Sequence, residues 1–411
     1  DDTGAAVLDG LGAVLGEALA SQAGIHEKWG GVVPRLAQDG HRNAIDQTVE
    51  EALKRAGAAP ADLSAVAVTV GPGLGLCLEV GVRKALQIAA EHRLPLVRVH
   101  HMEAHTLVTR LPPADAIAAA AAGGPPQELS PAFPFLTLLV SGGHNMAVLT
   151  RGIGSHTILG STLDDSVGEA FDKTARTLGI AQIPGGPHLE KLAREGDAGA
   201  HRLPKPLSKT RDPWLQKSCD YSFSGLKTAV RSLCEKAIPA LADKDAPEPD
   251  ERRRARADIA ASFQRVAVEH LCERAGRAAE WATEQEPEIK SLVVAGGVAA
   301  NQQVRQGLKE VAEDADLEMR CPPPRLCVDN GVMVAWAGVE RLRLGLYEEP
   351  PSAARADHFV EIRPRWPLGG RDPRSTGPMV PKPPKGQKRK APPAPEAPAQ
   401  KQQLQQEPEA P

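Results

Sequence analysis

Several kinds of sequence feature are scarce or absent in this chain of 411 residues. The six cysteines are scattered without a Cys-x-x-Cys pair, which argues against a disulfide framework or a zinc knuckle and predicts reduced thiols. No apolar run approaches the roughly 18 residues that a transmembrane helix needs, so no membrane span is expected. No targeting segment is recognisable either. Because the chain starts at Asp1 without a methionine, an upstream segment is expected to have been removed.

Two common nucleotide-binding signatures are also missing. The chain has no Walker A lysine motif, and it has no Gly-x-Gly-x-x-Gly followed by an acidic residue about 20 positions later. P-loop and Rossmann folds are therefore disfavoured. The formal net charge is −3, so RNA could be bound only through local basic patches. Residues 201–217, with five lysines and arginines, form one candidate patch, and a solvated loop is the alternative.

Aromatic residues make up only 3% of the chain, whereas Ala, Gly and Pro are abundant. Much of this bias lies in residues 111–131 and in the tail from residue 371, which is rich in Pro, Lys and Gln. These segments offer few apolar side chains to offset the entropy lost on ordering. We expect both to be flexible.

Short apolar strands alternate with amphipathic helices along the rest of the chain, which predicts an α/β protein with two lobes of related architecture. The domains expected are a first lobe (1–112), a flexible insert (113–131), a second lobe (132–350), a C-terminal extension (351–370) and a disordered tail (371–411). Strands are expected at residues 5–8, 13–19, 65–70, 95–99, 135–140, 147–150, 156–160 and 291–295. Helices are expected at 45–56, after 75 up to 89, and at 100–109, 166–178, 257–283, 301–311 and 330–344.

The most specific local motif is His101-Met102-Glu103-Ala104-His105. On a helix, residues four apart lie on one face about one turn apart, so both imidazoles can reach one cation. Neutral imidazole is a good ligand for transition metals, and a third ligand could come from anywhere in the chain. Two solvated histidines at a helix start are the alternative that the spacing leaves open.

Glu103 decides between two kinds of metal site. In the metalloprotease helix the catalytic Glu directly follows the first His. Glu103 lies two residues after His101, about 200° around a helix, and therefore points away from the histidine pair. This placement argues against a protease.

Glycine-rich turns follow several predicted strands, and acidic residues lie near them. The turns fall at residues 71–75, 141–144, 184–187 and 296–297. Glycine lets the backbone approach a ligand closely, and amides at a helix N-terminus suit phosphate. A carboxylate such as Asp329 could bind a metal or a ribose hydroxyl, although capping of the following helix is a strong alternative. Together the turns predict a nucleotide cleft, whereas any one of them could be only a turn.

As an ordered set, these motifs resemble a known family. They are, in chain order, Asp1-Asp2-Thr3-Gly4, His101-Met102-Glu103-Ala104-His105, Leu139-Val140-Ser141-Gly142-Gly143-His144, Gly168-Glu169-Ala170-Phe171-Asp172-Lys173, Tyr221-Ser222-Phe223-Ser224-Gly225-Leu226-Lys227, Ala295-Gly296-Gly297-Val298-Ala299-Ala300-Asn301 and Asp329-Asn330-Gly331. The set is similar to the universal family of tRNA N6-adenosine threonylcarbamoyltransferases, once described as O-sialoglycoprotein endopeptidases. The likeness extends over nearly everything from Asp1 to about Pro367, except the alanine-rich insert at residues 111–131 and the charged loop at residues 243–258. Residues 321–331 look most like the organellar branch, which is usually mitochondrial.

The resemblance implies the two-lobed α/β fold shared by actin, heat-shock ATPases and sugar kinases. It also implies one divalent metal ion per subunit, iron or zinc, held by His101, His105 and Asp329. The substrate threonylcarbamoyl-AMP would lie against Leu139, Val140, Ser141, Gly142 and Gly143, with Asp172, Gly186, Glu190 and Asn301 around its adenosine part. As a further hypothesis, Asp1 would assist proton removal from the attacking amine.

The activity implied is transfer of threonylcarbamoyl to N6 of the adenosine beside the anticodon, in tRNAs that read codons starting with A. A homodimer in an organelle, mitochondrial by preference, is expected as well. Family members begin with a strand that ends in Glu-Thr-Ser-Cys before the aspartates. That strand is absent from this sequence, so the first lobe is expected to lack a central strand.

Three other functions stay open at this stage. A non-catalytic nucleotide-binding subunit that regulates a partner would also use the cleft. A metalloprotease is disfavoured by the position of Glu103. A sugar or acyl kinase of the same fold would not explain the histidine pair.

Overall fold

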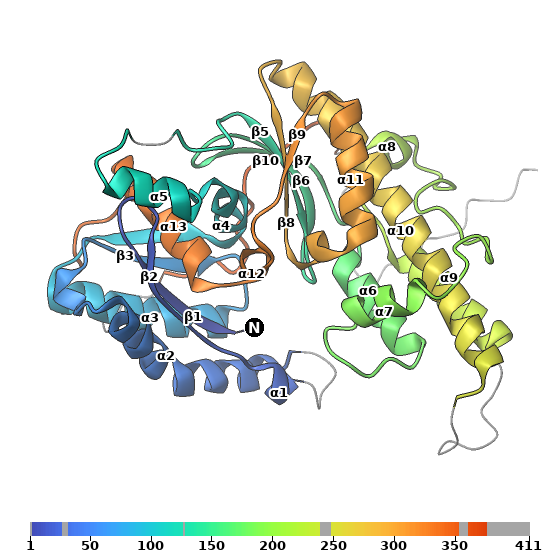
Figure 1. The fold of residues 1–411 in the computed structure, drawn as a ribbon, viewed down its shortest axis with the longest axis horizontal. Helices are drawn as coiled ribbons and strands as arrows, with labels where there is room; N and C mark the ends of the chain where they lie inside the picture. The colour runs from blue at the N-terminus through green and yellow to red at the C-terminus, as the bar shows by residue number, and fades with distance from the viewer. Residues whose placement is uncertain (1, 27–31, 126–127, 239–247, 353–360, 376–411) are drawn as a thin grey trace, which may run out of the picture. The chain divides into compact units, whose positions relative to one another are not determined.

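The computed structural model describes residues 2–26, 32–125, 128–238, 248–352 and 361–375. Strands and helices alternate in two lobes, with the N-terminal elements in one and the longest helix, α10, in the other (Figure 1). The predicted two-lobed α/β class is confirmed. Among the described residues, no helix is long and apolar enough to span a membrane. All six cysteines are free thiols, as predicted.

The first lobe contains two separate strand pairs. β1 (Thr3–Leu8) and β2 (Val14–Ala20) are antiparallel, and β3 (Val66–Gly71) and β4 (Leu96–His100) are parallel. The helices of this lobe are α1 (Ala23–His26), α2 (Pro34–Ala56), the 3₁₀ turn η2 (Pro60–Asp62), α3 (Gly75–His92), α4 (His101–Leu107), η3 (Val108–Arg110) and α5 (Ala114–Ala121).

The sheet of the first lobe is split between these two pairs. In the described part of the chain, no ladder of hydrogen bonds joins β1–β2 to β3–β4. Residues of β1 and β3 both line one large cavity.

The second lobe is built on a six-stranded sheet in the order β10-β7-β6-β5-β8-β9. β5 pairs antiparallel with β6 and parallel with β8. The strands are β5 (Phe135–Val140), β6 (Asn145–Gly152), β7 (Ser155–Ser161), β8 (Ser291–Ala295), β9 (Glu318–Arg320) and β10 (Gly370–Arg371). Every residue of β5 and β8 is buried, which explains why both read as continuous apolar runs rather than alternating patterns.

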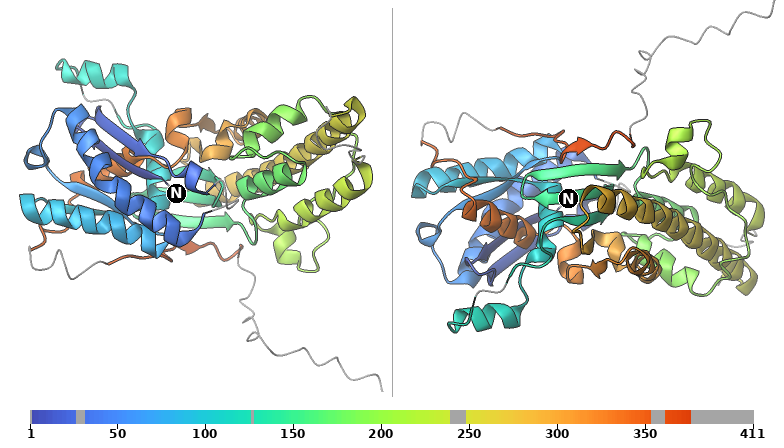
Figure 2. Two further views of the ribbon diagram at one scale, coloured as in Figure 1. Left: turned by 90° about the horizontal axis from the view of Figure 1, so that it is seen from below. Right: turned by 90° about the horizontal axis from the view of Figure 1, so that it is seen from above.

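Helices cover this sheet, and Figure 2 shows the two lobes from two further directions. The helices from residue 167 onward are α6 (Val167–Thr177), α7 (Gly186–Ala193), α8 (Pro213–Lys217), α9 (Ser224–Ala237), α10 (Asp250–Gln285), η4 (Gly297–Ala300), α11 (Gln302–Asp314), α12 (Pro324–Cys327) and α13 (Gly331–Arg343), of which α13 packs in the first lobe instead. The long helix α10 packs on α7, α9 and α11. Phe263 of α10 meets Phe171 of α6 edge to face, with ring centroids 5.0 Å apart, in the main core.

The predicted boundary of the second lobe at residue 350 is wrong, because α13 packs in the first lobe. It contacts β1, β3, β4 and α4 (Figure 1). A Cβ on Gly331 would lie 2.6 Å from the carbonyl carbon of Ala5, so glycine allows α13 to begin directly against β1. The apolar face of α13, with Trp336 fully buried, completes the core of the first lobe.

One further boundary prediction needs correction. Residues 371–375 are not part of a disordered tail, since β10 pairs with β7 and Asp372 and Ser375 are buried. Residues 376–411 lie outside the described part of the chain. The insert 113–131, expected to be flexible, contains helix α5, as the high helix propensity of its alanine run allows. No described residue of α5 is buried.

Candidate active site and metal centre

The histidine pair enters the site where a strand runs directly into a helix. β4 ends at His100 and α4 begins at His101. The Nδ1 atom of His100 accepts a hydrogen bond from the backbone N–H of Met102 (3.1 Å) and so caps α4, while its Nε2 bonds the carbonyl of Trp366 (2.9 Å). His100 is buried, and this burial lowers its pKa to about 4. The predicted helix with two histidines on one face is confirmed.

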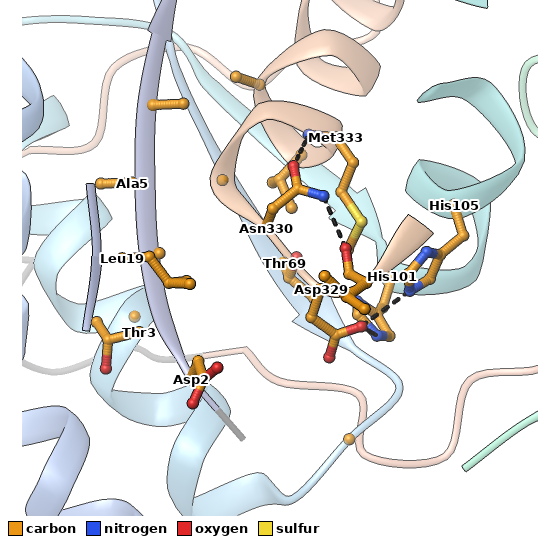
Figure 3. A pocket seen from close by; sticks show the side chains of 18 of the residues that line it. Asp2, Thr3, Ala5, Leu19, Thr69, His101, His105, Asp329, Asn330 and Met333 are labelled. Atoms are coloured by element: carbon orange, nitrogen blue, oxygen red, sulfur yellow. Dashed lines mark hydrogen bonds and ion pairs between the residues drawn. The ribbon is translucent and has the colours of Figure 1, made fainter. Parts of the chain in front are cut away.

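Asp329 meets both histidines from the other side (Figure 3). Its Oδ1 lies 3.0 Å from Nε2 of His105 and 3.5 Å from Nε2 of His101. Asp329 precedes α13, whose first turn is capped by Asn330 accepting from the N–H of Met333 (2.8 Å). The alternative that Asp329 itself caps this helix is therefore wrong, and its carboxylate is available to the histidines.

These three side chains fit a divalent cation. In the described part of the chain, one ligand atom from each of His101, His105 and Asp329 lies within 4.8 Å of the other two. Two imidazoles and one carboxylate are the donors that zinc and iron accept. The side chain of His105 is 6% exposed and that of Asp329 is 52% exposed, so the site opens on one side.

The charges in this cluster are coupled. Partial desolvation inside the cavity would by itself raise the pKa of Asp329, but hydrogen bonds from His101 and His105 hold it well below its usual value. His144, which follows the glycine loop, lines the same cavity. Burial, reinforced by the neighbouring imidazoles of His101 and His105, lowers the pKa of His144. His144 was not predicted as a site residue, although its position directly after Ser141-Gly142-Gly143 was visible in the sequence.

Glu103 projects away from the histidine pair, as predicted. Its Oε1 accepts from the N–H of Gly154 (2.6 Å) and contacts Nε2 of His156 (2.9 Å), and its Oε2 accepts from Arg341 (2.8 Å). Burial would raise its pKa, but these partners together lower it. A carboxylate bound in this way cannot activate water at the histidines, so the geometry contradicts a metalloprotease mechanism.

The glycine loop after β5 lies on the N-terminus of α6. The N–H of Gly168 donates to the carbonyl of Ser141 (3.2 Å), and the hydroxyl of Ser166 donates to the carbonyl of Gly142 (2.5 Å). A Cβ on Gly168 would lie 2.7 Å from that Ser141 oxygen, so the loop can approach the helix only at a glycine. Space above Gly142 and Gly143 is open. The loop and helix end form a site suited to phosphate.

Most of the other predicted substrate residues line the same cavity, whose volume is about 1830 Å³. Asp172 accepts from the N–H of Gly186 (3.0 Å), and burial raises the pKa of Asp172 despite this bond. Glu190 accepts from the N–H of Gln302 (3.1 Å), and Asn301 caps α11. The residues that the fold brings together here are His101, His105, Ser141, Gly142, Gly143, Asp172, Gly186, Glu190, Asn301 and Asp329.

Three predicted residues are not brought into this set. Leu139 and Val140 are buried in β5, pack in the core and do not line the cavity, because the strand turns into the loop only after them. Asp1 lies outside the described residues. Its neighbour Asp2 lines the cavity, on the side away from Asp329 in Figure 3, and its Oδ1 accepts from the N–H of Gln22 (2.8 Å).

Comparison with known proteins identifies the group to which this chain belongs. A sequence model of the family described as tRNA N6-adenosine threonylcarbamoyltransferase matches residues 13–336. The chain is 50% identical over 372 residues to an Arabidopsis thaliana protein named probable tRNA N6-adenosine threonylcarbamoyltransferase, mitochondrial, covering 90% of this chain and 73% of that protein. The chain belongs to the tRNA N6-adenosine threonylcarbamoyltransferase family.

Bacterial and animal members of this threonylcarbamoyltransferase family give the same result. The Granulibacter bethesdensis enzyme is 42% identical over 383 residues, covering 92% of this chain and 94% of that protein. The mitochondrial enzyme of Danio rerio is 39% identical over 382 residues, covering 90% of this chain and 86% of that protein. The predicted activity, a transferase that modifies adenosine in tRNA, is confirmed, and nothing favours a regulatory subunit or a protease.

Proposed function

We propose that this chain transfers threonylcarbamoyl from threonylcarbamoyl-AMP to N6 of the tRNA adenosine beside the anticodon, with one divalent metal ion held by His101, His105 and Asp329. The observation that carries the proposal is the meeting of this His/His/Asp group with the glycine loop at residues 141–143 in one cavity. A metal ligand set and a phosphate site side by side suit a substrate that joins a carbonyl to an adenylate.

The glycine loop is the proposed seat of the adenylate phosphate. The N–H of Ser141 already donates to the carbonyl of His144 (2.8 Å), so the backbone amides of Gly142 and Gly143, with the N-terminus of α6 behind them, are the groups proposed to attract negative charge. Asp172, Glu190 and Asn301 lie around the same cavity and offer oxygen and amide groups to the ribose and adenine. The donor would then lie with its adenosine in the second lobe and its threonylcarbamoyl group toward the histidines.

The reaction exchanges one bond for another. The N6 nitrogen attacks the carbamoyl carbon, an N–C bond forms, the bond from that carbon to the phosphate oxygen breaks, and AMP leaves. A bound metal would supply Lewis acidity toward the carbamoyl group. The amides of the glycine loop stabilise the charge that grows on the departing phosphate. The proton lost from N6 passes to a nearby base, and we propose Asp1 for this role.

The proposed RNA contact is the basic stretch at residues 201–217. All five lysines and arginines of the stretch are exposed, and Lys205 forms an ion pair with Glu273 (2.6 Å). Trp214 in the same stretch is 51% exposed, and an exposed indole can stack on an unpaired base. We also propose that the chain forms a homodimer and acts in an organelle. The relatives named mitochondrial support the location.

The test uses the chain, unmodified tRNA that reads codons starting with A, and separately prepared threonylcarbamoyl-AMP. Nucleosides from the digested tRNA are analysed by mass spectrometry. Threonylcarbamoyladenosine that forms with the donor, and that falls strongly in His101→Ala, supports the proposal. Equal product from the wild type and His101→Ala would contradict the role of the metal. Absence of product from the wild type, with intact tRNA and added metal, would overturn the proposed donor reaction.

A further inference from the structure

Glu103 is a buried carboxylate that the proposed reaction does not use. Its side chain is 2% exposed, and it lies on α4 between the two histidines in sequence but on the opposite side of the helix. Burial of an ionised carboxylate is costly unless several donors compensate it. Gly154, His156 and Arg341 supply such donors, so the carboxylate is fully engaged.

The three partners of Glu103 come from different parts of the fold. Gly154 and His156 belong to the turn between β6 and β7 and to β7 itself, in the second lobe. His156 is held in turn by the hydroxyl of Thr150 (3.1 Å). Arg341 is on α13, in the first lobe. A single side chain thus ties α4 to both lobes.

One of these ties connects the two elements that carry the His/His/Asp group. His101 and His105 are on α4, and Asp329 directly precedes α13. Along α13, Arg341 lies on the order of 16 Å from Asn330 at 1.5 Å per residue. The short helix α4, of seven residues, is therefore fixed at the start of α13 through His105 and near its end through Glu103.

We propose that Glu103 is a positioning residue that fixes the rotation of α4, so that His101 and His105 face Asp329. The inference rests on the proposed metal site. A helix of two turns has few internal hydrogen bonds to hold its orientation. Without the Glu103 contacts, α4 can rotate about its axis, and each histidine moves away from the carboxylate. The metal site then loses affinity even though all three ligands are present.

A fold-stabilising role alone would have a different consequence, and Asp220 offers a matched control. Asp220 is also a buried carboxylate, and it accepts from a backbone N–H (Ser161, 2.8 Å) and from an arginine (Arg371, 2.6 Å). These contacts of Asp220 lie around β7 and β10, and neither of them involves His101, His105 or Asp329. Asp220→Asn and Glu103→Gln each remove one buried charge with little change of shape.

The experiment titrates the full chain, freed of metal by a chelator, with Co²⁺ and follows the visible absorption of the bound ion. We expect Glu103→Gln to lower the Co²⁺ association constant by about tenfold to a hundredfold, the range seen when groups that orient metal ligands are removed. Asp220→Asn should bind Co²⁺ within about twofold of the wild type although its melting temperature also falls. Faster amide hydrogen exchange in α4 should accompany the loss in Glu103→Gln.

Arg341→Met provides a second test that leaves the sequence of α4 unchanged. This variant can replace Glu103→Gln if Glu103→Gln does not fold. It should also weaken Co²⁺ binding, and the double variant should be little weaker than Glu103→Gln alone, because both remove one contact. Co²⁺ binding that depends on His105 but is equal in the wild type, Glu103→Gln and Arg341→Met would overturn the positioning role alone. Wild-type binding that does not depend on His105 would overturn the proposed metal site and this inference with it.

Discussion

Nε2 of His105 lies 3.0 Å from Oδ1 of Asp329, although the two residues are 224 positions apart in the sequence. The contact depends on two local structures, the helix that starts at the end of β4 and the turn before α13. It also depends on α13 packing in the first lobe, beside α4. The metal-ligand geometry is thus a product of the tertiary fold.

Gly168→Ala should damage donor binding. The new Cβ would lie 2.7 Å from the Ser141 carbonyl oxygen and 2.8 Å from Gly142, so the glycine loop must shift. We expect the KM for threonylcarbamoyl-AMP to rise by at least about tenfold, with a stability loss of about 1–3 kcal/mol from overpacking. Steady-state kinetics and chemical denaturation measure the two effects.

Gly225→Ala is the control for that variant. Gly225 is also near the start of a helix, α9, but a Cβ there would meet nothing within 4 Å. Alanine is the better helix former, so stability should not fall. If Gly168→Ala bound the donor as well as Gly225→Ala does, the glycine loop would not be the phosphate site.

Asp172→Asn should weaken the donor complex while leaving the fold intact. An amide oxygen can still accept from the N–H of Gly186, but the carboxylate charge offered to a ribose hydroxyl is lost. We expect about a tenfold increase in KM for threonylcarbamoyl-AMP and little change in kcat. Asp197→Asn, which removes the charge of a carboxylate that likewise accepts from a glycine N–H (Gly199, 2.8 Å) in an exposed loop, should change neither. Unchanged KM in Asp172→Asn would remove Asp172 from the substrate site.

The stability of the protein should fall with decreasing pH partly because of His270. Burial, reinforced by the charge of Arg274, lowers the pKa of His270 from 6.5 to about 3. The unfolded chain therefore binds a proton below about pH 6.5 that the folded chain excludes until about pH 3. The free energy of unfolding should fall in this window by up to about 1.4 kcal/mol per pH unit from this residue.

His270→Gln tests this assignment, because glutamine does not titrate. Its oxygen can replace Nε2 of His270 as the acceptor for the N–H of Ser222 (3.3 Å). Between pH 7 and pH 5, the variant should lose about 2 kcal/mol less stability than the wild type in denaturant titrations. Identical pH dependence in the two proteins would show that the folded state protonates His270 as readily as the unfolded chain does.

Local patterns in the sequence predicted much of the fold. β8 was predicted with its observed bounds, and the caps Ser166 and Asn330 begin their helices at the predicted starts. Strong periodicity, cap residues and glycine turns are local signals. α9 and β9 were not predicted, and β10 has only two residues, which is too short for any pattern.

Local sequence patterns could not predict features that depend on packing between distant segments. The spacing of His101 and His105 predicted a shared cation, but only the family resemblance suggested Asp329 as the third ligand. Nothing in the sequence indicated that α13 returns to the first lobe, that His101 and His105 influence the pKa of His144, or that Arg341 meets Glu103. Each of these contacts joins residues that the folded chain alone brings together.

The most direct test of the central claim compares metal content and tRNA modification in the same dialysed preparations of wild type, His105→Ala, Asp329→Asn and His92→Ala. His92, at the end of α3, is the control histidine. The account predicts about one metal ion per chain and product formation in the wild type and His92→Ala, and loss of both in His105→Ala and Asp329→Asn. Full modification of tRNA by the metal-free His105→Ala protein would contradict it.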